Sequence, residues 1–364
     1  MVDLQSQYKF IKDKVDKSVI NVMDNASFIN GPSVKSFQKN LENYLDIKHV
    51  IPCANGTDAL QIAMMGLDLK PGDEVITADF TFASTVEVIA LLNLTPVLVD
   101  VELETFNIDC SKIRKAITSK TKAIVPVHLF GQSANMEEIM KIAKEHKLYV
   151  IEDNAQAIGS EYQFSSGSKV KTGTIGDVGT TSFFPSKNLG CFGDGGAIFT
   201  NNDDLAHILR GIVNHGMYKR YHHDVVGVNS RLDSIQAAVL NIKLPHLDSY
   251  NKARQNAARN YTTALKNTEG ILTPEVGKKC TQICENCDCH VFHQYTIRIL
   301  NNKRDGLAKH LSDLNIPFGI YYPIPLHRQK AYWSSRYNEN DFSNTNLLCD
   351  QVISLPMHSE LELD

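Results

Sequence analysis

One lysine and one carboxylate follow apolar segments at positions that suit covalent chemistry. Lys187 stands on a short turn just after the apolar run 178–184, and four glycines follow it before residue 197. Asp153 closes another apolar run, 149–153. A carboxylate there is costly to bury unless it meets a cation or hydrogen-bond donors. Asp153 is therefore either a counter-ion or the cap of the next helix.

Two further features suit a phosphate group and an aromatic ring. Gly56 and Thr57 open a helical pattern after the apolar run 49–53. The free N–H groups of a helix start bind phosphate, and we expect Thr57 or Asp58 to cap this helix. An ordinary strand-to-helix turn is the alternative. Phe82 follows the next apolar run, either as a platform for a ring or as a core side chain.

These residue types together predict a site for pyridoxal 5'-phosphate. Lys187 suits a Schiff base with the cofactor aldehyde, and Asp153 suits keeping the pyridine nitrogen protonated. Phe82 suits covering the ring. The phosphate is expected to meet Gly56, Thr57 and the hydroxyl group of Ser182. We expect the glycines after Lys187 to leave room for the cofactor and a substrate.

Short apolar runs alternate with helical patterns through the first two hundred residues. We expect strands at 49–53, 74–77, 96–100, 123–128, 149–153, 178–184 and 196–200, with helices at 57–67, 83–92, 111–118 and 136–146. This alternation predicts an α/β fold with a mainly parallel seven-stranded sheet covered on both faces. A long helical pattern from 232 to about 266 leads to a smaller C-terminal α/β domain with strands at 291–300 and 319–322. The predicted domains are 1–240 and 241–364.

Composition excludes several classes of protein. The chain has 364 residues, 43% of them hydrophobic and 21% charged, which suits a folded protein of about two domains. Its net charge of −4 provides no basic field for a nucleic acid. We find neither an apolar run of 18 residues nor a secretory leader, so we expect a cytoplasmic protein without a membrane partner.

Several segments resemble the DegT/DnrJ/EryC1/StrS family. The segments that carry the likeness are CANGTDAL at 53–60, IEDNAQ at 151–156, the stretch 181–202 around Lys187, GVNSRLD at 227–233, YPIPL at 322–326 and SLPMH at 354–358. The likeness extends over nearly the whole chain. It implies fold type I, the aspartate-aminotransferase fold, and a nucleotide-sugar aminotransferase that uses pyridoxal phosphate.

The resemblance also implies a role for each residue of the site. Lys187 would bind the cofactor and move the proton, Asp153 would pair with the pyridine nitrogen, and Gln156 would reach the ring hydroxyl group. Phe82 would stack on the ring. The implied phosphate ligands are Gly56, Thr57, Ser182 and, from the neighbouring subunit of a homodimer, Asn229. Arg231 either supports the same wall or forms a structural ion pair.

The likeness is greatest to UDP-2-acetamido-2-deoxy-3-oxo-glucuronate aminotransferases, which serve surface polysaccharides such as the lipopolysaccharide O-antigen. It implies L-glutamate as the amino donor and a nucleotide-linked keto sugar as the acceptor. Tyr321 and Tyr322 stand where a His-Tyr pair is common, so a 6-deoxy 3-oxo or 4-oxo hexose is the alternative. The expected substrate residues are Asn30, Gly31, His215, Arg220, His223, Arg231, Tyr321 and Tyr322. We expect the loop 215–223 to contact the diphosphate or uronate of the substrate, or else to be simply solvated. The alternative role of Gly31 is to form a turn before Pro32, and that of Tyr322 is to pack in the fold.

Two features of the sequence fall outside this interpretation. Cys280, Cys284, Cys287 and Cys289 cluster before His290, but the spacing lacks two clean CxxC pairs, so we expect reduced thiols and no metal. Members of the family usually continue into a final helix, which the resemblance implies is missing after residue 364.

Two other classes of protein share parts of this sequence pattern. An NAD-dependent sugar oxidoreductase would need G-x-G-x-x-G after the first strand, and that motif is absent there. A non-catalytic regulatory protein of the same fold has no need of a lysine at position 187.

Overall fold

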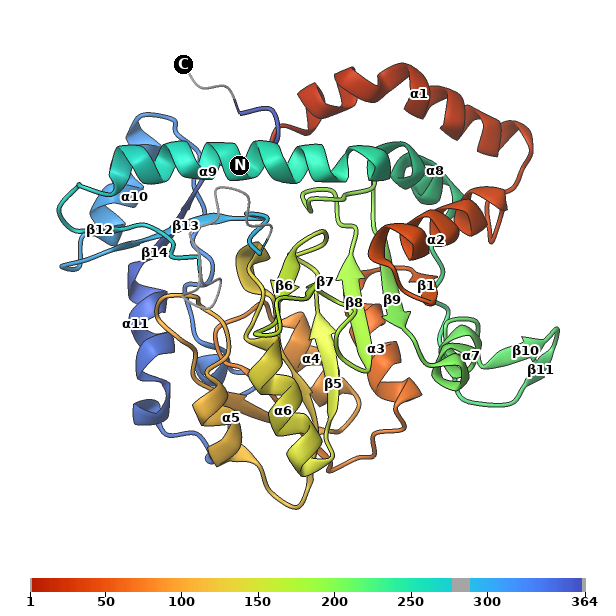
Figure 1. Cartoon of the computed structure of the whole chain (residues 1–364), viewed down its shortest axis with the longest axis horizontal. Helices are drawn as coiled ribbons and strands as arrows, with labels where there is room; N and C mark the ends of the chain where they lie inside the picture. The colour runs from red at the N-terminus through yellow and green to blue at the C-terminus, as the bar shows by residue number, and fades with distance from the viewer. Residues whose placement is uncertain (1, 277–288, 362–364) are drawn as a thin grey trace.

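A seven-stranded sheet forms the centre of the computed structural model, which describes residues 2–276 and 289–361 (Figure 1). Its order is β1-β9-β8-β5-β4-β2-β3. The strands are β1 (His49–Cys53), β2 (Glu74–Ala78), β3 (Thr95–Val99), β4 (Thr121–Val125), β5 (Tyr149–Asp153), β8 (Val178–Ser182) and β9 (Gly196–Thr200). Strand β9 is antiparallel to both of its neighbours, and the other pairs of this sheet are parallel. The predicted mainly parallel sheet of seven strands is confirmed.

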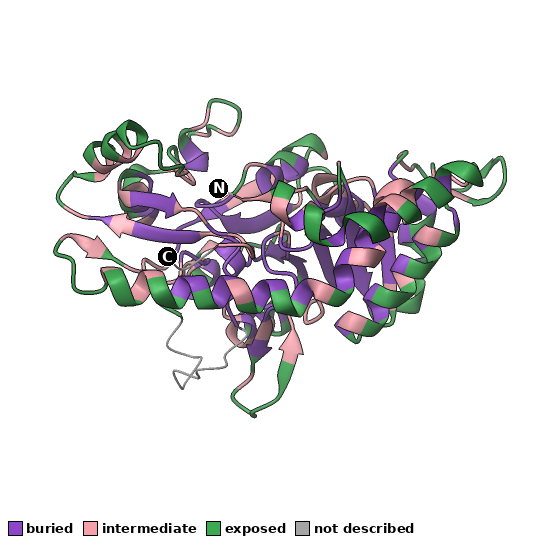
Figure 2. Ribbon diagram, turned by 90° about the horizontal axis from the view of Figure 1, so that it is seen from above, coloured by how far each residue is buried: buried purple, intermediate pink, exposed green. Residues whose placement is uncertain are grey.

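Helices cover both faces of this sheet. They are α2 (Pro32–Leu45), α3 (Gly56–Gly66), α4 (Ser84–Leu91), α5 (Cys110–Ala116), α6 (Met136–His146), α7 (Asp203–Ile212) and α8 (Ser234–Lys243). Helix α1 (Leu4–Asp24) packs on α8, where Ile11 and Val15 contact Val239. Ile151 packs in the core cluster on the α3 and α7 face, whereas its neighbour Val150 packs on the α5 and α6 face. Successive strand residues point to opposite faces, so a sheet covered twice requires unbroken apolar strands. Figure 2 shows the buried strands between helices with exposed outer faces.

The helical pattern predicted over 232–266 forms two helices. Helix α8 ends at Lys243, the 3-10 turn Leu244–His246 follows, and α9 (Leu247–Leu265) then runs along the top of Figure 1 toward the C-terminal part. Pro245 lies in the turn, and a proline has no backbone N–H for the helical ladder. The predicted helical pattern is therefore confirmed, but as two helices that meet at this residue.

The C-terminal part contains a three-stranded antiparallel sheet, β12 (Ile271–Leu272), β13 (Tyr295–Ile299) and β14 (Val352–Leu355). The core beside it includes residues of α9 and α10 (Arg304–Asp313), and α11 (Ser343–Gln351) precedes β14. The strand predicted at 291–300 is confirmed only from residue 295, because Val291 and Gln294 instead donate to the carbonyl groups of Gly131 and Phe130. The strand predicted at 319–322 was wrong: Gly319 makes an isolated bridge to Ser354.

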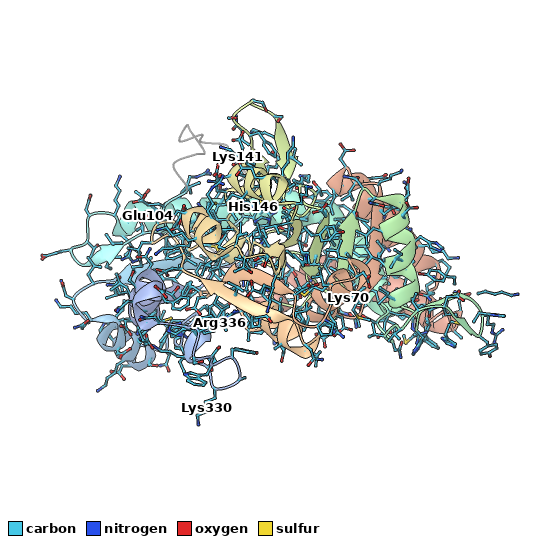
Figure 3. The ribbon with its side chains drawn as sticks, turned by 90° about the horizontal axis from the view of Figure 1, so that it is seen from below. Lys70, Glu104, Lys141, His146, Lys330 and Arg336 are labelled. Carbon is cyan, nitrogen blue, oxygen red and sulfur yellow. The ribbon has the colours of Figure 1, made fainter. Side chains whose placement is uncertain are left out.

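The chain after Tyr322 returns to the first sheet. Leu326 and Phe342 pack with side chains of α4 and β3. Arg336, labelled in Figure 3, donates from Nη2 to Oε1 of Glu74 at 3.0 Å. Residues from the two ends of the sequence therefore share one edge of the sheet, and the division at residue 240 stays a prediction.

Two short hairpins were not predicted from the sequence. They are formed by β6 (Glu161–Gln163) with β7 (Lys169–Lys171) and by β10 (Met217–Lys219) with β11 (His222–His223). The second projects beside α7 at the right of Figure 1. In the described part of the chain, no helix is both long and apolar enough to span a membrane.

Gly196 is a position where a side chain has no space. A β-carbon there would lie 2.4 Å from the carbonyl carbon of Asn55 and 2.9 Å from the backbone nitrogen of Gly56. These are backbone atoms, which cannot rotate away. We expect Gly196→Ala to lower the free energy of unfolding by about 2 kcal/mol, measured by denaturant titration.

Gly306→Ala is the matched control for that substitution. Gly306 lies in α10, and a β-carbon there would meet no atom within 4 Å. Alanine favours a helix interior by up to about 1 kcal/mol over glycine, so this variant should be as stable as the wild type or more stable. Equal losses in the two variants would contradict the steric explanation.

Candidate active site

The carboxyl ends of the parallel strands bring the predicted cofactor residues to one edge of the sheet. Helix α3 starts there after β1, and Phe82 follows β2. Asp153 ends β5, Ser182 ends β8, and Lys187 follows β8. Because β5 and β8 are paired and parallel, Asp153 and Lys187 approach the same point from adjacent strands. The edge predicted from the sequence is the edge at which open α/β sheets bind ligands.

Lys187 lies on a tight turn. Its backbone N–H donates to the carbonyl group of Phe184 at 2.8 Å, and Cys191 N–H donates back to Phe183 at 2.8 Å. Burial lowers the pKa of the Lys187 amine from 10.5 to about 8, while the negative charge of Asp153 opposes that shift. The amine is consequently neutral in a useful fraction of molecules near neutral pH, which a nucleophile and a general base both require.

The carboxylate of Asp153 is 4% exposed and held from two sides. Thr85 Oγ1 donates to Oδ2 at 2.8 Å, and the N–H of Ala155 donates to Oδ1 at 3.2 Å. Each carboxylate oxygen accepts more than one hydrogen bond, so acceptor capacity remains for a protonated ring nitrogen. The alternative that Asp153 only caps a helix is not supported, because no helix begins after β5 before the β6 hairpin.

Gln156 connects the sheet edge to the C-terminal segment. Its Oε1 accepts from the N–H of Phe130 at 2.6 Å, and its Nε2 donates to the hydroxyl oxygen of Tyr322 at 3.2 Å. Burial raises the pKa of Tyr322, so its hydroxyl group keeps its proton and can donate onward. The ring of Tyr322 lies 6.2 Å from that of Phe82. The structure thus brings these three side chains together.

Phe82 is not a core side chain. It is 57% exposed, whereas Phe80, two residues earlier, is 1% exposed and packs inside. An exposed aromatic ring at the ligand edge of the sheet is available to stack on a planar group. The alternative of core packing was wrong for Phe82.

The expected phosphate residues also come together. A β-carbon on Gly56 would lie 2.7 Å from the β-carbon of Ser182, so the two residues are in contact. The cap of α3 is Asn55, whose Oδ1 accepts from the N–H of Asp58 at 2.8 Å, and the prediction of Thr57 or Asp58 as the cap was wrong. Gly56 and Thr57 form the first turn of the helix, where backbone N–H groups have no intrahelical partner. The result is a cradle of donors for an anion.

The glycines after Lys187 do not clear space for a ligand. A β-carbon on Gly190 would lie 2.3 Å from the carbonyl oxygen of Pro185, and one on Gly195 would meet Leu232, Cys191 and Phe183. These glycines instead let the chain fold closely around the Lys187 turn. The expectation that they make room for the cofactor was therefore wrong.

Several predicted substrate residues lie on exposed segments of this subunit. His215, Arg220 and His223 are exposed on the segment that carries the β10–β11 hairpin. Among the described residues, His223 Nδ1 pairs with the carbonyl oxygen of His215, and Arg220 donates to Tyr221. Asn229 is exposed, next to Ser230, whose hydroxyl oxygen accepts from Ala54 N–H at 3.0 Å.

The remaining predicted residues have local partners. Gly31 N–H donates to Ser234 Oγ at 3.1 Å, close to the exposed Asn30. Arg231 is half-buried beside Ser230, and Tyr321 packs against the same core cluster as Tyr322. Their roles toward a substrate stay predictions.

Sequence reasoning missed the partners that hold the cofactor residues. Thr85 holds Asp153, and His128 makes a buried pair with Glu152, one residue before Asp153. The sequence does carry a signal for His128, which ends the run 123–128 that was predicted as a strand. The next predicted strand, 149–153, ends in Asp153. No local signal marks Thr85.

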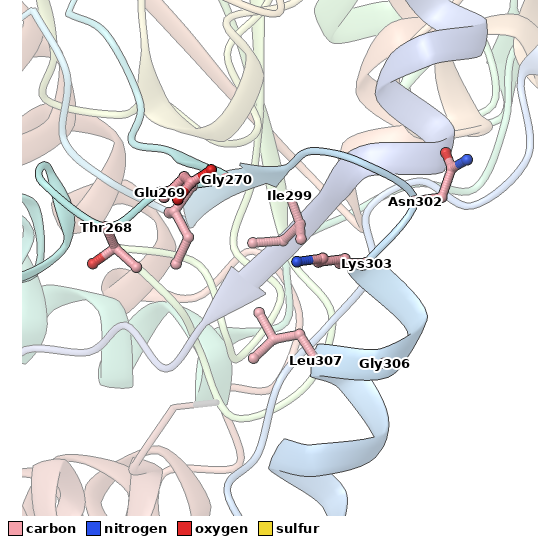
Figure 4. Close-up of a pocket in the computed structure, with 9 residues that line it drawn as sticks. Thr268, Glu269, Gly270, Ile299, Asn302, Lys303, Gly306 and Leu307 are labelled. Carbon is pink, nitrogen blue, oxygen red and sulfur yellow. The ribbon is translucent and has the colours of Figure 1, made fainter.

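The cysteine cluster falls largely outside the described residues, which include Cys289 but not Cys280, Cys284 or Cys287. The described ranges contain no group of three or more His, Cys, Asp or Glu side chains suited to a metal ion. A separate hollow of about 490 Å³ lies in the C-terminal part, where Lys303 extends between Ile299 and Leu307 (Figure 4). None of the predicted site residues lines it.

Pyridoxal phosphate fits the residues at the sheet edge. They offer an amine with a lowered pKa, a buried carboxylate, an exposed aromatic ring and an anion cradle, which are the groups that this cofactor needs. The geometry defines a pyridoxal-phosphate-dependent enzyme of fold type I.

Comparison with known proteins agrees with this class. The DegT/DnrJ/EryC1/StrS aminotransferase family matches residues 9–364, and the chain belongs to that family. A pleiotropic regulatory protein of Geobacillus stearothermophilus is 45% identical over 100% of this chain and 94% of its own length. A UDP-2-acetamido-2-deoxy-3-oxo-D-glucuronate aminotransferase of Pseudomonas aeruginosa is 43% identical over 99% and 95%.

A solved structure supports the fold. DesV of S. venezuelae, in complex with a ketimine intermediate, superposes with a TM-score of 0.92 at 36% identity, covering 99% of this chain and 93% of that one. The fold-type-I assignment and the use of pyridoxal phosphate are confirmed. The G-x-G-x-x-G oxidoreductase alternative is excluded by the family.

The lowered pKa of Lys187 gives a pH prediction for the cofactor-free protein. Only the neutral amine attacks an aldehyde, so the rate of covalent attachment of pyridoxal phosphate should rise with pH through a midpoint near 8. Stopped-flow absorbance measures it. Asp153 raises the pKa of Lys187, so Asp153→Asn should move the midpoint to lower pH. A midpoint near 10.5 in the wild type, or no shift in the variant, would contradict the electrostatic account; Lys187→Arg is the unreactive control.

Proposed function

We propose that the enzyme transfers the amino group of L-glutamate to C3 of a UDP-linked 2-acetamido-2-deoxy-3-oxo-glucuronate, or a close analogue. The product would enter a surface polysaccharide such as the lipopolysaccharide O-antigen. At the coarser level the enzyme is a pyridoxal-phosphate-dependent nucleotide-sugar aminotransferase. The observation that carries amino transfer is the position of Lys187, which follows β8 next to the strand that ends in Asp153; burial lowers the pKa of its amine to about 8.

The roles of the site residues follow from their surroundings. When bound, the cofactor supplies an electron-withdrawing ring. Asp153 would accept a hydrogen bond from the protonated ring nitrogen, and Gln156 with Tyr322 would orient the ring hydroxyl side. Nζ of Lys187, once free and neutral, would carry a proton away from the Cα of the donor. The expected phosphate ligands are Gly56, Thr57 and Ser182.

We infer a homodimer in which Asn229 acts in the partner's site. Asn229 is exposed in its own subunit, and so are His215, Arg220 and His223 on the projecting segment. The same segment exposes 77% of Tyr221 and 85% of Val226, and a neighbouring subunit would cover this apolar surface. Arg220 and His223 would there meet the anionic diphosphate or carboxylate of the sugar.

The sugar specificity rests on likeness. The relative from Pseudomonas aeruginosa carries a name for 3-oxo-glucuronate amination, whereas other relatives carry names for dTDP-sugar transaminases. Tyr321 supports the alternative of a 6-deoxy 3-oxo or 4-oxo hexose, because it has no positive charge to pair with a uronate. We place the reaction in the cytoplasm.

Glutamate should change the spectrum of the loaded enzyme. We expect the visible absorbance band of the lysine-bound cofactor to disappear on addition of L-glutamate and to return on addition of the correct keto sugar. The comparison uses UDP-3-oxo sugars with and without the C6 carboxylate and a dTDP-linked 6-deoxy 3-oxo sugar. Lys187→Ala should show neither change. Return of the band only with the dTDP sugar would overturn the proposed substrate, and no bleaching by glutamate would overturn the proposed donor.

Mixed dimers test the role of Asn229. Subunits carrying Lys187→Ala and subunits carrying Asn229→Ala are each expected to be inactive as homodimers. If Asn229 acts across the interface, dimers reassembled from equal amounts contain one intact site in each heterodimer. About a quarter of the wild-type activity should then return. No recovery, with heterodimers confirmed by differently tagged subunits, would place Asn229 in its own subunit's site or outside the site.

A further inference from the structure

Glu152 is a fully buried carboxylate that the proposed reaction does not use. It precedes Asp153 in β5, and because successive strand residues point to opposite faces, its side chain points away from that of Asp153. Its exposed fraction is 0%. A buried carboxylate is costly unless donors surround it, so the structure must provide those donors.

Four donors surround the Glu152 carboxylate. The backbone N–H groups of Ile175 and Gly176 donate to Oε1 at 2.6 and 2.7 Å. The N–H of Gly173 donates to Oε2 at 2.8 Å, and His128 Nε2 lies 2.9 Å from the same oxygen. Three of the four donors belong to the loop 173–176, which leads into β8 and so toward Ser182 and Lys187.

The tautomer of His128 follows from its other contact. His128 Nδ1 accepts from the N–H of Ala134 at 3.1 Å, so the imidazole proton lies on Nε2 and is donated to Glu152. His128 is also fully buried. Its backbone N–H donates to the carbonyl oxygen of Asp153 at 3.0 Å. His128 therefore links the segment after β4 to the end of β5 through both its side chain and its backbone.

The pair of Glu152 and His128 also supports Phe130, whose N–H donates to Gln156. Residues 128–134 form a short loop held at one end by His128 and at the other by the Ala134 contact. Phe130, inside this loop, donates its N–H to Gln156. The His128 contacts thus act beside those of Asn107 and Gln294, which bond to Leu129 and Phe130, in fixing that donor.

We propose that Glu152 and His128 are positioning residues for the cofactor site. Together they fix the ends of β4 and β5 and the loop before β8, which carry or support Gln156, Asp153 and Lys187. The inference deepens the proposed site and rests on Asp153 and Gln156 contacting the cofactor. Neither positioning residue touches the ligand, and their effect is on the geometry of the residues that do.

Glu152→Gln tests this with little change of shape. The amide nitrogen brings two hydrogens to a place where N–H groups already point inward, so at least one contact becomes repulsive. We expect the dissociation constant of pyridoxal phosphate to rise by about tenfold or more, the scale at which lost outer support weakens a ligand site. We also expect the visible circular dichroism of the bound cofactor to change, because it reports the orientation of the ring.

Asp100→Asn is the matched control. Asp100 follows β3, is 1% exposed, and likewise accepts four hydrogen bonds, from the N–H groups of Val101, Asn344 and Thr345 and from Thr345 Oγ1. Both variants should lose thermal stability in the cofactor-free state, whereas only Glu152→Gln should weaken cofactor binding and alter the dichroism. The inference would be overturned if both variants weakened cofactor binding equally. It would also be overturned if Glu152→Gln kept the wild-type dissociation constant of pyridoxal phosphate.

A second pair of variants covers the case in which Glu152→Gln does not fold. His128→Leu removes both side-chain contacts, and His128→Gln can restore a donor to Glu152 and an acceptor for Ala134. Cofactor binding should be weakened in the first and largely recovered in the second; equal weakening would overturn the positioning role. Borohydride reduction and peptide mapping of the wild type precede these tests. Attachment away from Lys187 would overturn the site itself, whereas attachment at Lys187 with unaffected variants would overturn this inference alone.

Discussion

Desolvation of the Lys187 amine, opposed by the charge of Asp153, is the interaction on which the rest of the site depends. Burial alone would make the amine a weak acceptor of protons, and the carboxylate alone would keep it charged. The balance leaves its pKa near 8. The adjacent parallel strands β5 and β8 keep the two groups within electrostatic range of each other, and backbone hydrogen bonds fix the turn after β8. A change in either strand end would therefore alter the chemistry of the amine.

The sheet and the shared edge were predictable because both follow from local patterns. Runs of Val and Ile mark strands covered on both faces, and the carboxyl ends of parallel strands must meet. From these patterns Gly56, Phe82, Asp153 and Ser182 are predicted at the same edge as Lys187, and the structure places them there. The contact of each of these residues with the cofactor stays a prediction.

The features of the fold and the site that were not predicted depend on contacts between distant segments, and such contacts leave no local pattern in the sequence. Gln156 and Tyr322 bond across 166 positions of the sequence, and the segment after Tyr322 packs on β2 and β3 rather than forming a strand of its own domain. Asn55 was missed as the cap because the helix begins one residue earlier than the predicted start. The glycines after Lys187 carry a strong signal, but sequence cannot tell whether a missing side chain makes room for a ligand or for the protein itself.

One side of the site is complete within a single subunit, and the other is open. Gln156 and Tyr322 close it beside the ring position, whereas Phe82 and Phe184 are each more than half exposed. Amino transfer benefits from a site that excludes water, because water competes for the reactive carbon and weakens electrostatic contacts. The histidines of the projecting hairpin segment are exposed and contact none of these aromatic residues through the bonds described in this subunit. We infer that a second copy of the chain supplies the missing wall, so that the apolar and cationic side chains of one subunit complete the sugar site of the other.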